Sequence, residues 1–350
     1  LVTCHCSMMK TVPGSIVAPR GFLAGGVCCD VKRLGTGKGS DKGRKRDLAL
    51  IVSEVPATVA GMFTTNQICA APVKVCLPRV AQGRAQAIVV NSGNANACTG
   101  AQGLADAREM TRRVAKVLAL PPRHVLVAST GRIGAPLPME NIREGIGRAT
   151  AALGDAPEHG DQAAEAIMTS DTRPKAMAVE FRLGRKRVRL GGICKGAGMI
   201  QPGMSADGKR PAALPKHATM LAFLTTDAAV AFRPLQTALR EAVARSFNRV
   251  TVDGDMSTND TVIFMANGAS GVAAETREAR QVVQSMLDDA LLQLARLCVK
   301  DGEGATKLVE VRVNGAASDP YARSVADTVA NSSLVKTALF GQDANWGRIL

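Results

Sequence analysis

Several residue types and patterns that mark common functional classes are scarce or absent in this sequence. Tryptophan and tyrosine occur once each and aromatic residues make up 3% of the chain, so side chains on which nucleic-acid bases could stack are few. No apolar run approaches the roughly 20 residues that a membrane-spanning helix needs. The first ten residues lack the basic-then-apolar pattern of a secretory signal. These absences predict a soluble protein that is not secreted.

Patterns typical of metal and nucleotide sites are also missing. The nine cysteines include no repeated Cys-x-x-Cys pair at zinc spacing. The stretch 253–260 resembles the start of a calcium loop, but Thr258 and Phe264 stand where glycine and glutamate are required. The glycine-rich stretch from Gly35 lacks the spacing of a phosphate-binding P-loop. The four histidines are scattered and suggest no Ser-His-Asp triad. We therefore expect no bound metal and no cofactor.

Positive charge is in excess, but it is unevenly distributed. The formal net charge is +14, while residues 219–350 carry 13 Lys and Arg against 15 Asp and Glu. The excess therefore lies in the first 218 residues, much of it in the glycine-rich stretch 32–46, which is predicted to be a surface loop. A solvated loop accounts for this charge, so we expect neither a nucleic-acid partner nor a membrane partner.

Short apolar strands alternate with amphipathic helices along the chain. Strands are predicted at 48–53, 87–91, 125–129, 179–183, 188–190, 219–225, 307–314 and 334–340. Helices are predicted at 103–120, 139–153, 161–168, 234–247 and 276–300, and 201–217 is predicted to be an exposed loop. The pattern indicates an α+β fold with mixed sheets and packed helices, without strict βαβ winding.

A nucleophile candidate follows from the lack of a histidine base. An N-terminal threonine can use its own α-amine as the base, and the pKa of that amine, about 7.7–8.0, is close to neutral pH. Thr219 stands after the predicted loop and at the start of an apolar strand. Cleavage between Ala218 and Thr219 would make it N-terminal. The spacing alone leaves open that Thr219 is an ordinary threonine at the start of a strand.

Long blocks of sequence point to one family. They include PRGFLAGGV from Pro19, VNSGNANACTG from Val90, VASTGRIG from Val127, KGAGMI from Lys195, ATMLAFLTTD from Ala218, SFNRVTVDGD from Ser246, DGEGATK from Asp301 and GQDANWGRIL from Gly341. In these blocks the chain resembles the ornithine acetyltransferases of arginine biosynthesis, which are glutamate N-acetyltransferases. The resemblance runs across most of the chain and implies a self-processing architecture of the N-terminal-nucleophile type, like that of DmpA-like proteins.

The resemblance implies a mechanism. The family cleaves itself at the Ala-Thr bond, here Ala218-Thr219, and the new N-terminal threonine takes the acetyl group of N2-acetyl-L-ornithine and passes it to L-glutamate in a ping-pong reaction. Some members also accept acetyl-CoA, so its use as a co-substrate stays open here. The family's oxyanion hole falls on Thr130 and Gly131. Donors there are chemically reasonable because attack on an acetyl carbonyl places negative charge on its oxygen.

Further substrate contacts are implied for residues in other blocks. They fall on Thr169 or Thr172, on Lys195 and on Glu303, in addition to Thr219. Lys195 can bind an α-carboxylate and Glu303 an ammonium group. The alternative for Lys195 and Glu303 is an ordinary surface ion pair.

The resemblance also bears on organisation. It implies an alpha segment, 1–218, and a beta segment, 219–350, which form one intertwined unit and assemble as a heterotetramer of two alpha and two beta segments. Family members continue past the final block, so the beta segment is expected to be truncated, and 201–217 is longer than in the family. The expected location is the cytoplasm, or the mitochondrial matrix in a eukaryote. Two alternatives remain: an aminopeptidase or amidase with an N-terminal nucleophile, and an inactive truncated member.

Overall fold

The computed structural model describes residues 9–36, 45–209 and 220–350. The predicted cleavage pair, Ala218 and Thr219, lies outside these ranges, as does most of the glycine-rich basic stretch.

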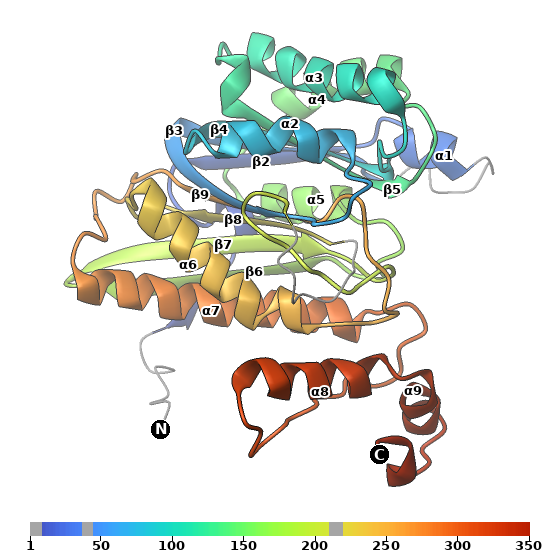
Figure 1. The fold of residues 1–350 in the computed structure, drawn as a ribbon. Helices are drawn as coiled ribbons and strands as arrows, with labels where there is room; N and C mark the ends of the chain where they lie inside the picture. The colour runs from blue at the N-terminus through green and yellow to red at the C-terminus, as the bar shows by residue number, and fades with distance from the viewer. Residues whose placement is uncertain (1–8, 37–44, 210–219) are drawn as a thin grey trace.

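The described strands form a nine-stranded mixed sheet in the order β1-β6-β7-β8-β9-β3-β4-β5, with β2 paired to β3 (Figure 1). The strands are β1 (Lys10–Thr11), β2 (Phe22–Val27), β3 (Leu48–Phe63), β4 (Arg84–Asn94), β5 (Val125–Arg132), β6 (Lys175–Leu183), β7 (Lys186–Lys195), β8 (Leu221–Thr226) and β9 (Thr261–Ala266). The pairs β4–β5 and β8–β9 are parallel and the other pairs are antiparallel. The predicted mixed α+β class is confirmed.

Strands from both sides of the proposed cleavage point belong to this one sheet. β8 and β9 follow residue 219 in sequence, yet they lie between β7 and β3, which precede it. All six residues of β8 are buried, as expected for a continuous apolar strand covered on both faces. The middle of the sheet therefore requires both segments of the chain.

Helices cover the sheet on several sides (Figure 1). They are α1 (Val31–Thr36), α2 (Ala71–Val80), α3 (Gly100–Val117), α4 (Met139–Ala151), α5 (Pro157–Ala166), α6 (Phe232–Arg245), α7 (Arg277–Lys300), α8 (Asp319–Asn331) and α9 (Ser333–Phe340), with short 3-10 helices at Ser15–Val17, Pro122–His124, Phe247–Arg249 and Trp346–Arg348. α3 packs on β5 and α4 on β2 and β3, while α7 packs on β6 and β7. α5 contacts both β2–β3 and β6–β7 and so joins the two halves of the sheet.

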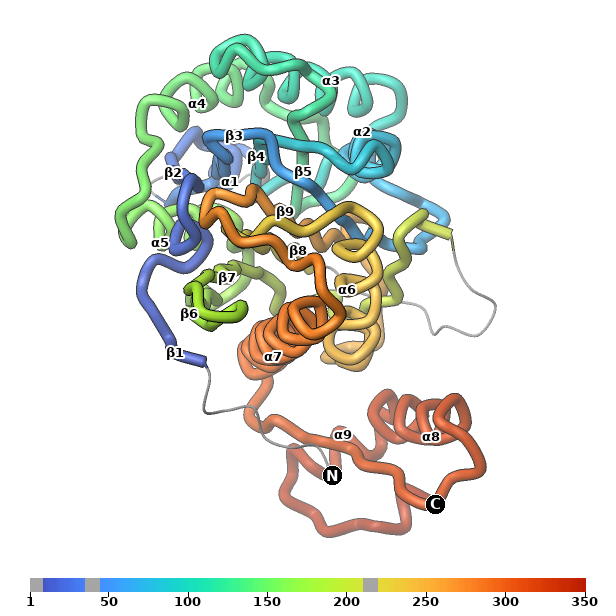
Figure 2. Tube along the Cα trace, turned by 90° about the vertical axis from the view of Figure 1, so that its left-hand side faces the viewer, coloured from blue at the N-terminus to red at the C-terminus, as the bar shows by residue number. Residues whose placement is uncertain are grey.

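The last part of the chain differs from its sequence-based prediction. The predicted strand at 334–340 is wrong, because these residues form helix α9, which begins where the Ser332 hydroxyl accepts a hydrogen bond from Val335 N. A short apolar run fits either element, and this cap favours the helix. The predicted strand at 307–314 is also wrong: alternating residues form no strand there, since no described strand pairs with them. Figure 2 shows α8 and α9 set apart from the body, beyond α7.

The predicted exposed loop at 201–217 begins inside the protein instead. Gln201 and Met204 are buried, and Met204 N donates a hydrogen bond to Asn248 Oδ1. Ser205 pairs with Phe63 at the end of β3. Polar partners for the backbone allow this stretch to enter the core.

No helix in the described ranges is both long and apolar enough to cross a membrane.

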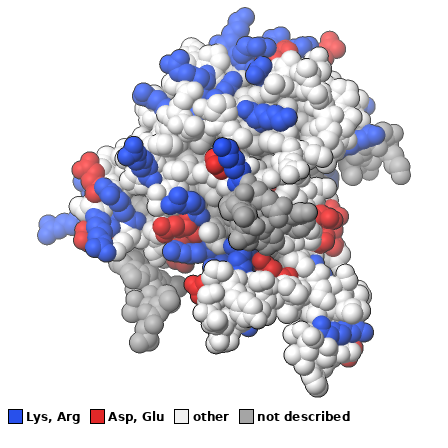
Figure 3. All heavy atoms as spheres, viewed as in Figure 1, with Lys and Arg blue, Asp and Glu red and all other residues white. Residues whose placement is uncertain are grey.

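On the face drawn in Figure 3, lysine and arginine side chains form separate spots with uncharged surface between them, and acidic side chains lie beside several of these spots.

Candidate active site

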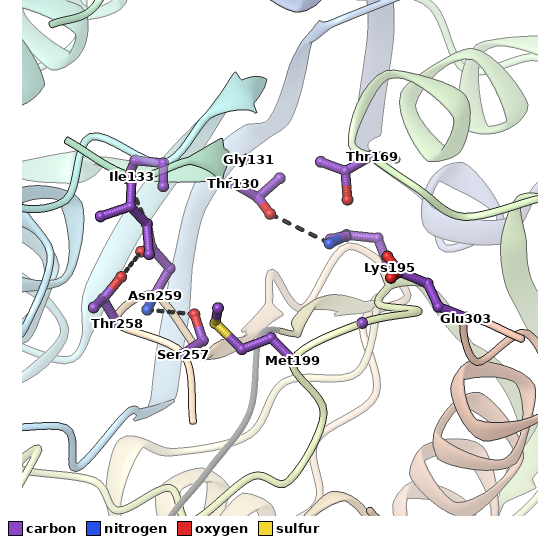
Figure 4. A pocket seen from close by; sticks show the side chains of 12 residues that line it. Thr130, Gly131, Ile133, Thr169, Lys195, Met199, Ser257, Thr258, Asn259 and Glu303 are labelled. Carbon is purple, nitrogen blue, oxygen red and sulfur yellow. Dashed lines mark hydrogen bonds between the residues drawn. The ribbon is translucent and has the colours of Figure 1, made fainter. Parts of the chain in front are cut away.

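A cavity of about 260 Å³ opens where the ends of β5 and β7 approach the loop that precedes β9. Its walls carry Thr130 and Gly131 from β5, Thr169 from the loop before β6, Lys195 from the last position of β7, and Glu303 from the segment after α7. Figure 4 shows these side chains around one space, with Met199 and residues 257–259 completing the wall. The fold thus brings together five residues that the sequence analysis predicted for the site.

The end of β5 is shaped by its close approach to β4. Gly131 has φ +129°, and a Cβ atom there would lie 2.4 Å from the backbone carbon of Gly93. Only glycine fits this path without strain. The neighbouring Thr130 is 1% exposed. As a result, the Thr130 side chain and the Gly131 backbone lie at adjacent positions of the cavity wall.

Lys195 places a cation against that wall. The residue is 2% exposed, and its Nζ atom donates a hydrogen bond to Thr130 Oγ1 over 3.3 Å (Figure 4). Burial lowers the pKa of the Lys195 ammonium, and the nearby Asp171 carboxylate opposes that shift. Because Lys195 donates to the Thr130 oxygen, the hydroxyl hydrogen is available to donate to another acceptor.

A buried cluster of charges lies behind the cavity. Lys175 Nζ contacts Asp171 Oδ1 at 2.5 Å and Asp301 Oδ2 at 2.6 Å, and Lys195 Nζ is 4.0 Å from Asp171 Oδ2. Burial alone would raise the pKa of Asp171, but Lys195 and Lys175 outweigh it and lower the pKa to about 2. Asp171 is therefore ionised throughout the neutral range.

The structure separates the two threonines between which the sequence could not choose. Thr169 lines the cavity. Thr172 does not line it; its hydroxyl and its backbone N–H both donate to the carboxylate of Asp301. Of the two, Thr169 is the one placed to contact a ligand.

Glu303 lies at the open side of the cavity. Its side chain is exposed, and its backbone N–H donates to Ala197 O over 2.8 Å. Lys195, by contrast, is buried, and the carboxylate with which it pairs belongs to Asp171. Lys195 and Glu303 therefore do not form an ordinary surface ion pair with each other.

The beginning of β8 is fixed by a carboxyl group that the sequence analysis missed. Met220, the residue after Thr219 in the sequence, donates its backbone N–H to Asp260 Oδ1 over 2.6 Å and accepts a hydrogen bond from Thr261 N. The Asp260 side chain is buried and its Oδ2 atom has no hydrogen-bond partner among the described residues. Burial raises the pKa of Asp260 well above its usual range. The available signal was that Asp260 stands just before the apolar run 262–266, for which the sequence analysis predicted no strand.

The loop that precedes β9 contributes polar side chains to the cavity wall. Asn259 Nδ2 donates to Ala95 O over 2.6 Å and to Ser129 O over 2.8 Å, which ties this loop to β5. The sequence analysis rejected a calcium loop at 253–260 and proposed no other role for Ser257, Thr258 and Asn259, which line the cavity. No group of three His, Cys, Asp or Glu side chains suited to a metal was found within the described ranges.

Together, these groups suit a polar, amino-acid-sized ligand. The wall offers neighbouring donors at Thr130 and Gly131, a buried ammonium at Lys195 and a carboxylate at Glu303. Donors side by side can stabilise an oxygen on which negative charge develops, while the cation and the carboxylate can bind the charged groups of an amino acid.

Relatives of known sequence resemble the chain over nearly its whole length. It is 49% identical over 345 residues to the arginine biosynthesis bifunctional protein ArgJ of Symbiobacterium thermophilum, covering 98% of this chain and 80% of that protein. It is 54% identical over 305 residues to the protein of the same name from Geobacter sulfurreducens, covering 87% of this chain and 74% of that protein.

Solved structures show the same fold. An ornithine acetyltransferase from Mycobacterium tuberculosis, solved in complex with ornithine, is 36% identical with a TM-score of 0.51, covering 56% of this chain and 100% of that chain. An L-aminopeptidase D-Ala-esterase/amidase from Ochrobactrum anthropi, described as a variant of the Ntn hydrolase fold, has a TM-score of 0.50 at 12% identity, covering 84% of this chain and 88% of that chain. The second likeness concerns the fold alone, and it confirms the expected architecture. Since the model of the ArgJ family matches residues 27–350 as well, the chain belongs to the ArgJ family.

Proposed function

We propose that this chain is a glutamate N-acetyltransferase that moves the acetyl group of N2-acetyl-L-ornithine to L-glutamate through an acetyl ester on Thr219. The observation that carries the proposal is the cavity at the end of β5 and β7, where Thr130, Gly131 and Lys195 meet. Family membership supports it, because the relatives are named as bifunctional proteins of arginine biosynthesis and one related structure is an ornithine acetyltransferase.

The first step is self-cleavage between Ala218 and Thr219. The Thr219 hydroxyl attacks the carbonyl carbon of Ala218, the C–N bond breaks, and water then hydrolyses the resulting ester. The products are a carboxylate on Ala218 and a free α-amine on Thr219. The freed amine then serves as the base for the hydroxyl.

The acetyl group is transferred in two half-reactions. The Thr219 oxygen attacks the acetyl carbonyl of acetylornithine, its proton passes by way of the α-amine to the departing ornithine nitrogen, and an acetyl ester remains. The amine of glutamate then attacks this ester and regenerates the hydroxyl. In both half-reactions, Thr130 and Gly131 donate hydrogen bonds to the carbonyl oxygen as it becomes negative.

Substrate binding follows from the charges of the cavity. The Lys195 ammonium binds the α-carboxylate that both substrates carry, Glu303 binds an ammonium group at the open side, and Thr169 adds a polar contact. No metal or cofactor is needed for these steps, and acetyl-CoA is the second acetyl donor to be tested. We also propose a heterotetramer of two alpha and two beta segments, located in the cytoplasm of a bacterium or in the mitochondrial matrix of a eukaryote.

Mass measurement and product analysis test the proposal together. The purified protein should give two masses, and sequencing of the smaller fragment should begin Thr-Met-Leu-Ala-Phe-Leu. It should also transfer labelled acetyl groups from acetylornithine to glutamate faster than to water. Thr219→Ala should leave one uncut, inactive chain, whereas the matched variant Thr219→Ser, which keeps a hydroxyl group, should still be cleaved.

Each contrary outcome has a distinct meaning. A single uncut mass in folded wild-type protein would support an inactive member and would contradict the proposal. Transfer to water in place of glutamate would instead identify an amidase. Steeply salt-dependent retention on DNA by the uncut protein would favour nucleic-acid binding.

A further inference from the structure

Asp171 stands outside the cavity but holds several of its walls. The residue lies between α5 and β6, and its side chain is fully buried. Its Oδ2 atom accepts a hydrogen bond from Thr169 N over 2.9 Å, and its Oδ1 atom accepts one from Gly196 N over 2.7 Å. Thr169 lines the cavity, and Gly196 opens the loop that carries Met199. One carboxylate thus fastens two separate segments of the wall to each other.

The same carboxylate faces the ammonium group of the cavity. Lys195 Nζ lies 4.0 Å from Asp171 Oδ2 and 3.3 Å from Thr130 Oγ1. The chain of contacts therefore runs from Asp171 through Lys195 to the Thr130 hydroxyl. Since each link is buried, solvent screens these interactions little.

A second acidic residue keeps Asp171 available for Lys195. Lys175 divides its ammonium group between Asp171 and Asp301, so the cluster of two lysines and two aspartates is neutral as a whole. Asp301 has no ion pair with Lys195 among the described residues. It pairs with Lys175, accepts from Thr172, and lies 3.9 Å from Arg173 Nε at the surface. The two aspartates are chemically alike but differ in whether they reach the cavity's ammonium.

The groups that act electrostatically on Lys195 come from several elements. They are Asp171 before β6, Lys175 on β6, Asp260 before β9 and Cys298 on α7. Of the carboxyl groups, Asp171 is ionised and hydrogen-bonded, whereas burial raises the pKa of Asp260. Asp171 is therefore the main negative charge that stabilises the ammonium form of Lys195.

We propose that Asp171 is a positioning residue of the acetyl-transfer site, which holds Lys195 charged and directed at the Thr130 hydroxyl while it ties Thr169 to the Gly196 loop. This inference deepens the proposed function and rests on it for its kinetic consequence only. Lys195 then occupies the acceptor side of the Thr130 oxygen, so that the hydroxyl hydrogen is directed to the substrate's carbonyl oxygen.

The test compares Asp171→Asn with Asp301→Asn in the full chain. The titration of Lys195 is followed by NMR of isotope-labelled lysine side chains, with Lys195→Met used to assign its signal. In Asp171→Asn the midpoint should move to lower pH by about one unit or more, because a neighbouring opposite charge is lost. In Asp301→Asn it should stay at the wild-type value although stability falls. An unchanged Lys195 midpoint in folded Asp171→Asn would overturn the proposal.

Kinetics supply a second, separate readout. In Asp171→Asn, kcat for acetyl transfer should fall about 10- to 100-fold with a smaller change in KM, and the basic limb of the pH profile should move with the Lys195 midpoint. If the wild-type protein transfers no acetyl group, the proposed function fails, while the NMR titration still decides whether Asp171 controls Lys195.

Asp171→Glu provides a variant for the case that the asparagine variant does not fold. It keeps the charge but displaces the carboxylate by one methylene group. A positioning role predicts a near-normal Lys195 midpoint together with reduced kcat. Wild-type kcat in folded Asp171→Glu would show that the placement of the carboxylate is unimportant and would refute the proposal.

Discussion

Two buried aspartates lie behind the cavity near Lys195, and the pKa values of their carboxyl groups are shifted in opposite directions. In the paired region before β6, Asp171 accepts hydrogen bonds from Lys175, Gly196 and Thr169, and its pKa is lowered to about 2. In the unpaired region at the starts of β8 and β9, Asp260 accepts one from Met220 N, and its pKa is raised. Burial favours the neutral form in both places, so the partners decide the outcome.

The comparison separates two uses of a buried carboxyl group. Both oxygens of Asp171 are hydrogen-bonded, as suits a residue that orients an ammonium group. The second carboxyl group has an unpartnered oxygen, Asp260 Oδ2, directly beside the residue that follows Thr219. Such an oxygen has a hydrogen-bonding capacity that remains unused within the described structure.

The largest effect on stability is expected from Lys175→Met, which removes the ammonium group that Asp171 and Asp301 share. The substitution removes the cation that both carboxylates share and leaves only more distant ones, Lys195 at 4.0 Å from Asp171 and Arg173 at 3.9 Å from Asp301. Breaking a buried pair from one side costs about 3–5 kcal/mol. Urea unfolding at pH 7, measured in the uncut Thr219→Ala background, should show this loss.

A matched surface pair provides the control for that loss. Arg245 and Asp288 are also 2.6 Å apart, but the arginine side chain is 52% exposed. Arg245→Met should cost about 1 kcal/mol or less. Equal losses in the two variants at pH 7 would show that the buried cluster stabilises the fold no more than a surface pair does.

The stabilisation by the buried cluster also depends on pH. Because the pKa of Asp171 is lowered by folding, its contribution to stability is present above the unfolded value of about 3.9 and is lost as the pH falls toward about 2.

The next largest effect concerns the Thr130 hydroxyl, which Asp171 is proposed to orient through Lys195. Thr130→Ala should lower kcat for acetyl transfer by about 10²–10³ with little change in KM, because the lost hydrogen bond forms chiefly in the transition state. Thr130→Ser keeps the hydroxyl and should retain most of the activity. Wild-type turnover in a cleaved Thr130→Ala protein would show that Thr130 is not part of the oxyanion hole.

The features that the sequence predicted well are those encoded within a single contiguous stretch of residues. Thr130, Gly131, Lys195 and Glu303 were predicted because each belongs to a short block with a family resemblance, and the structure places them at one cavity. Helix α7 was predicted because its 24 residues form a long periodic pattern. Local patterns of this kind are readable without a structure.

What the sequence did not reveal depends on contacts between distant residues. Asp260 acts on Met220, 40 positions away, and Asp171 acts on Gly196, 25 positions away. The local sequence does not mark Asp171 as buried, and the only local signal for Asp260 was the apolar run that follows it. The errors at 307–314 and 334–340 have the related cause that an alternating or apolar run becomes a strand only where another strand pairs with it.

The unpaired region around Asp260 predicts a pH dependence of stability opposite in direction to that of Asp171. The folded pKa of Asp260 is raised, so its contribution to stability is fully present below the unfolded value of about 3.9 and is lost as the pH rises through the folded value. In the uncut Thr219→Ala background, Asp260→Asn should abolish this decline while keeping the oxygen that accepts from Met220 N. Unfolding measured from pH 3 to pH 8 should show the two proteins diverging as the pH rises. Parallel curves would mean that Asp260 ionises in the folded protein as readily as in the unfolded one.

The smallest expected effects come from two threonines only three positions apart, which differ in whether they face the cavity. Thr169 lines it, whereas the Thr172 hydroxyl donates to Asp301 in the cluster behind it. Thr169→Val should raise KM for acetylornithine or glutamate several-fold, since one polar contact is worth about 0.5–1.5 kcal/mol, and should leave stability nearly unchanged. Thr172→Val should do the reverse, with a stability loss of about 1 kcal/mol and an unchanged KM. The two substitutions are chemically identical, so each is the control for the other. A raised KM in Thr172→Val with none in Thr169→Val would mean that the substrate enters from the side of the charged cluster and that the cavity wall has been assigned to the wrong threonine.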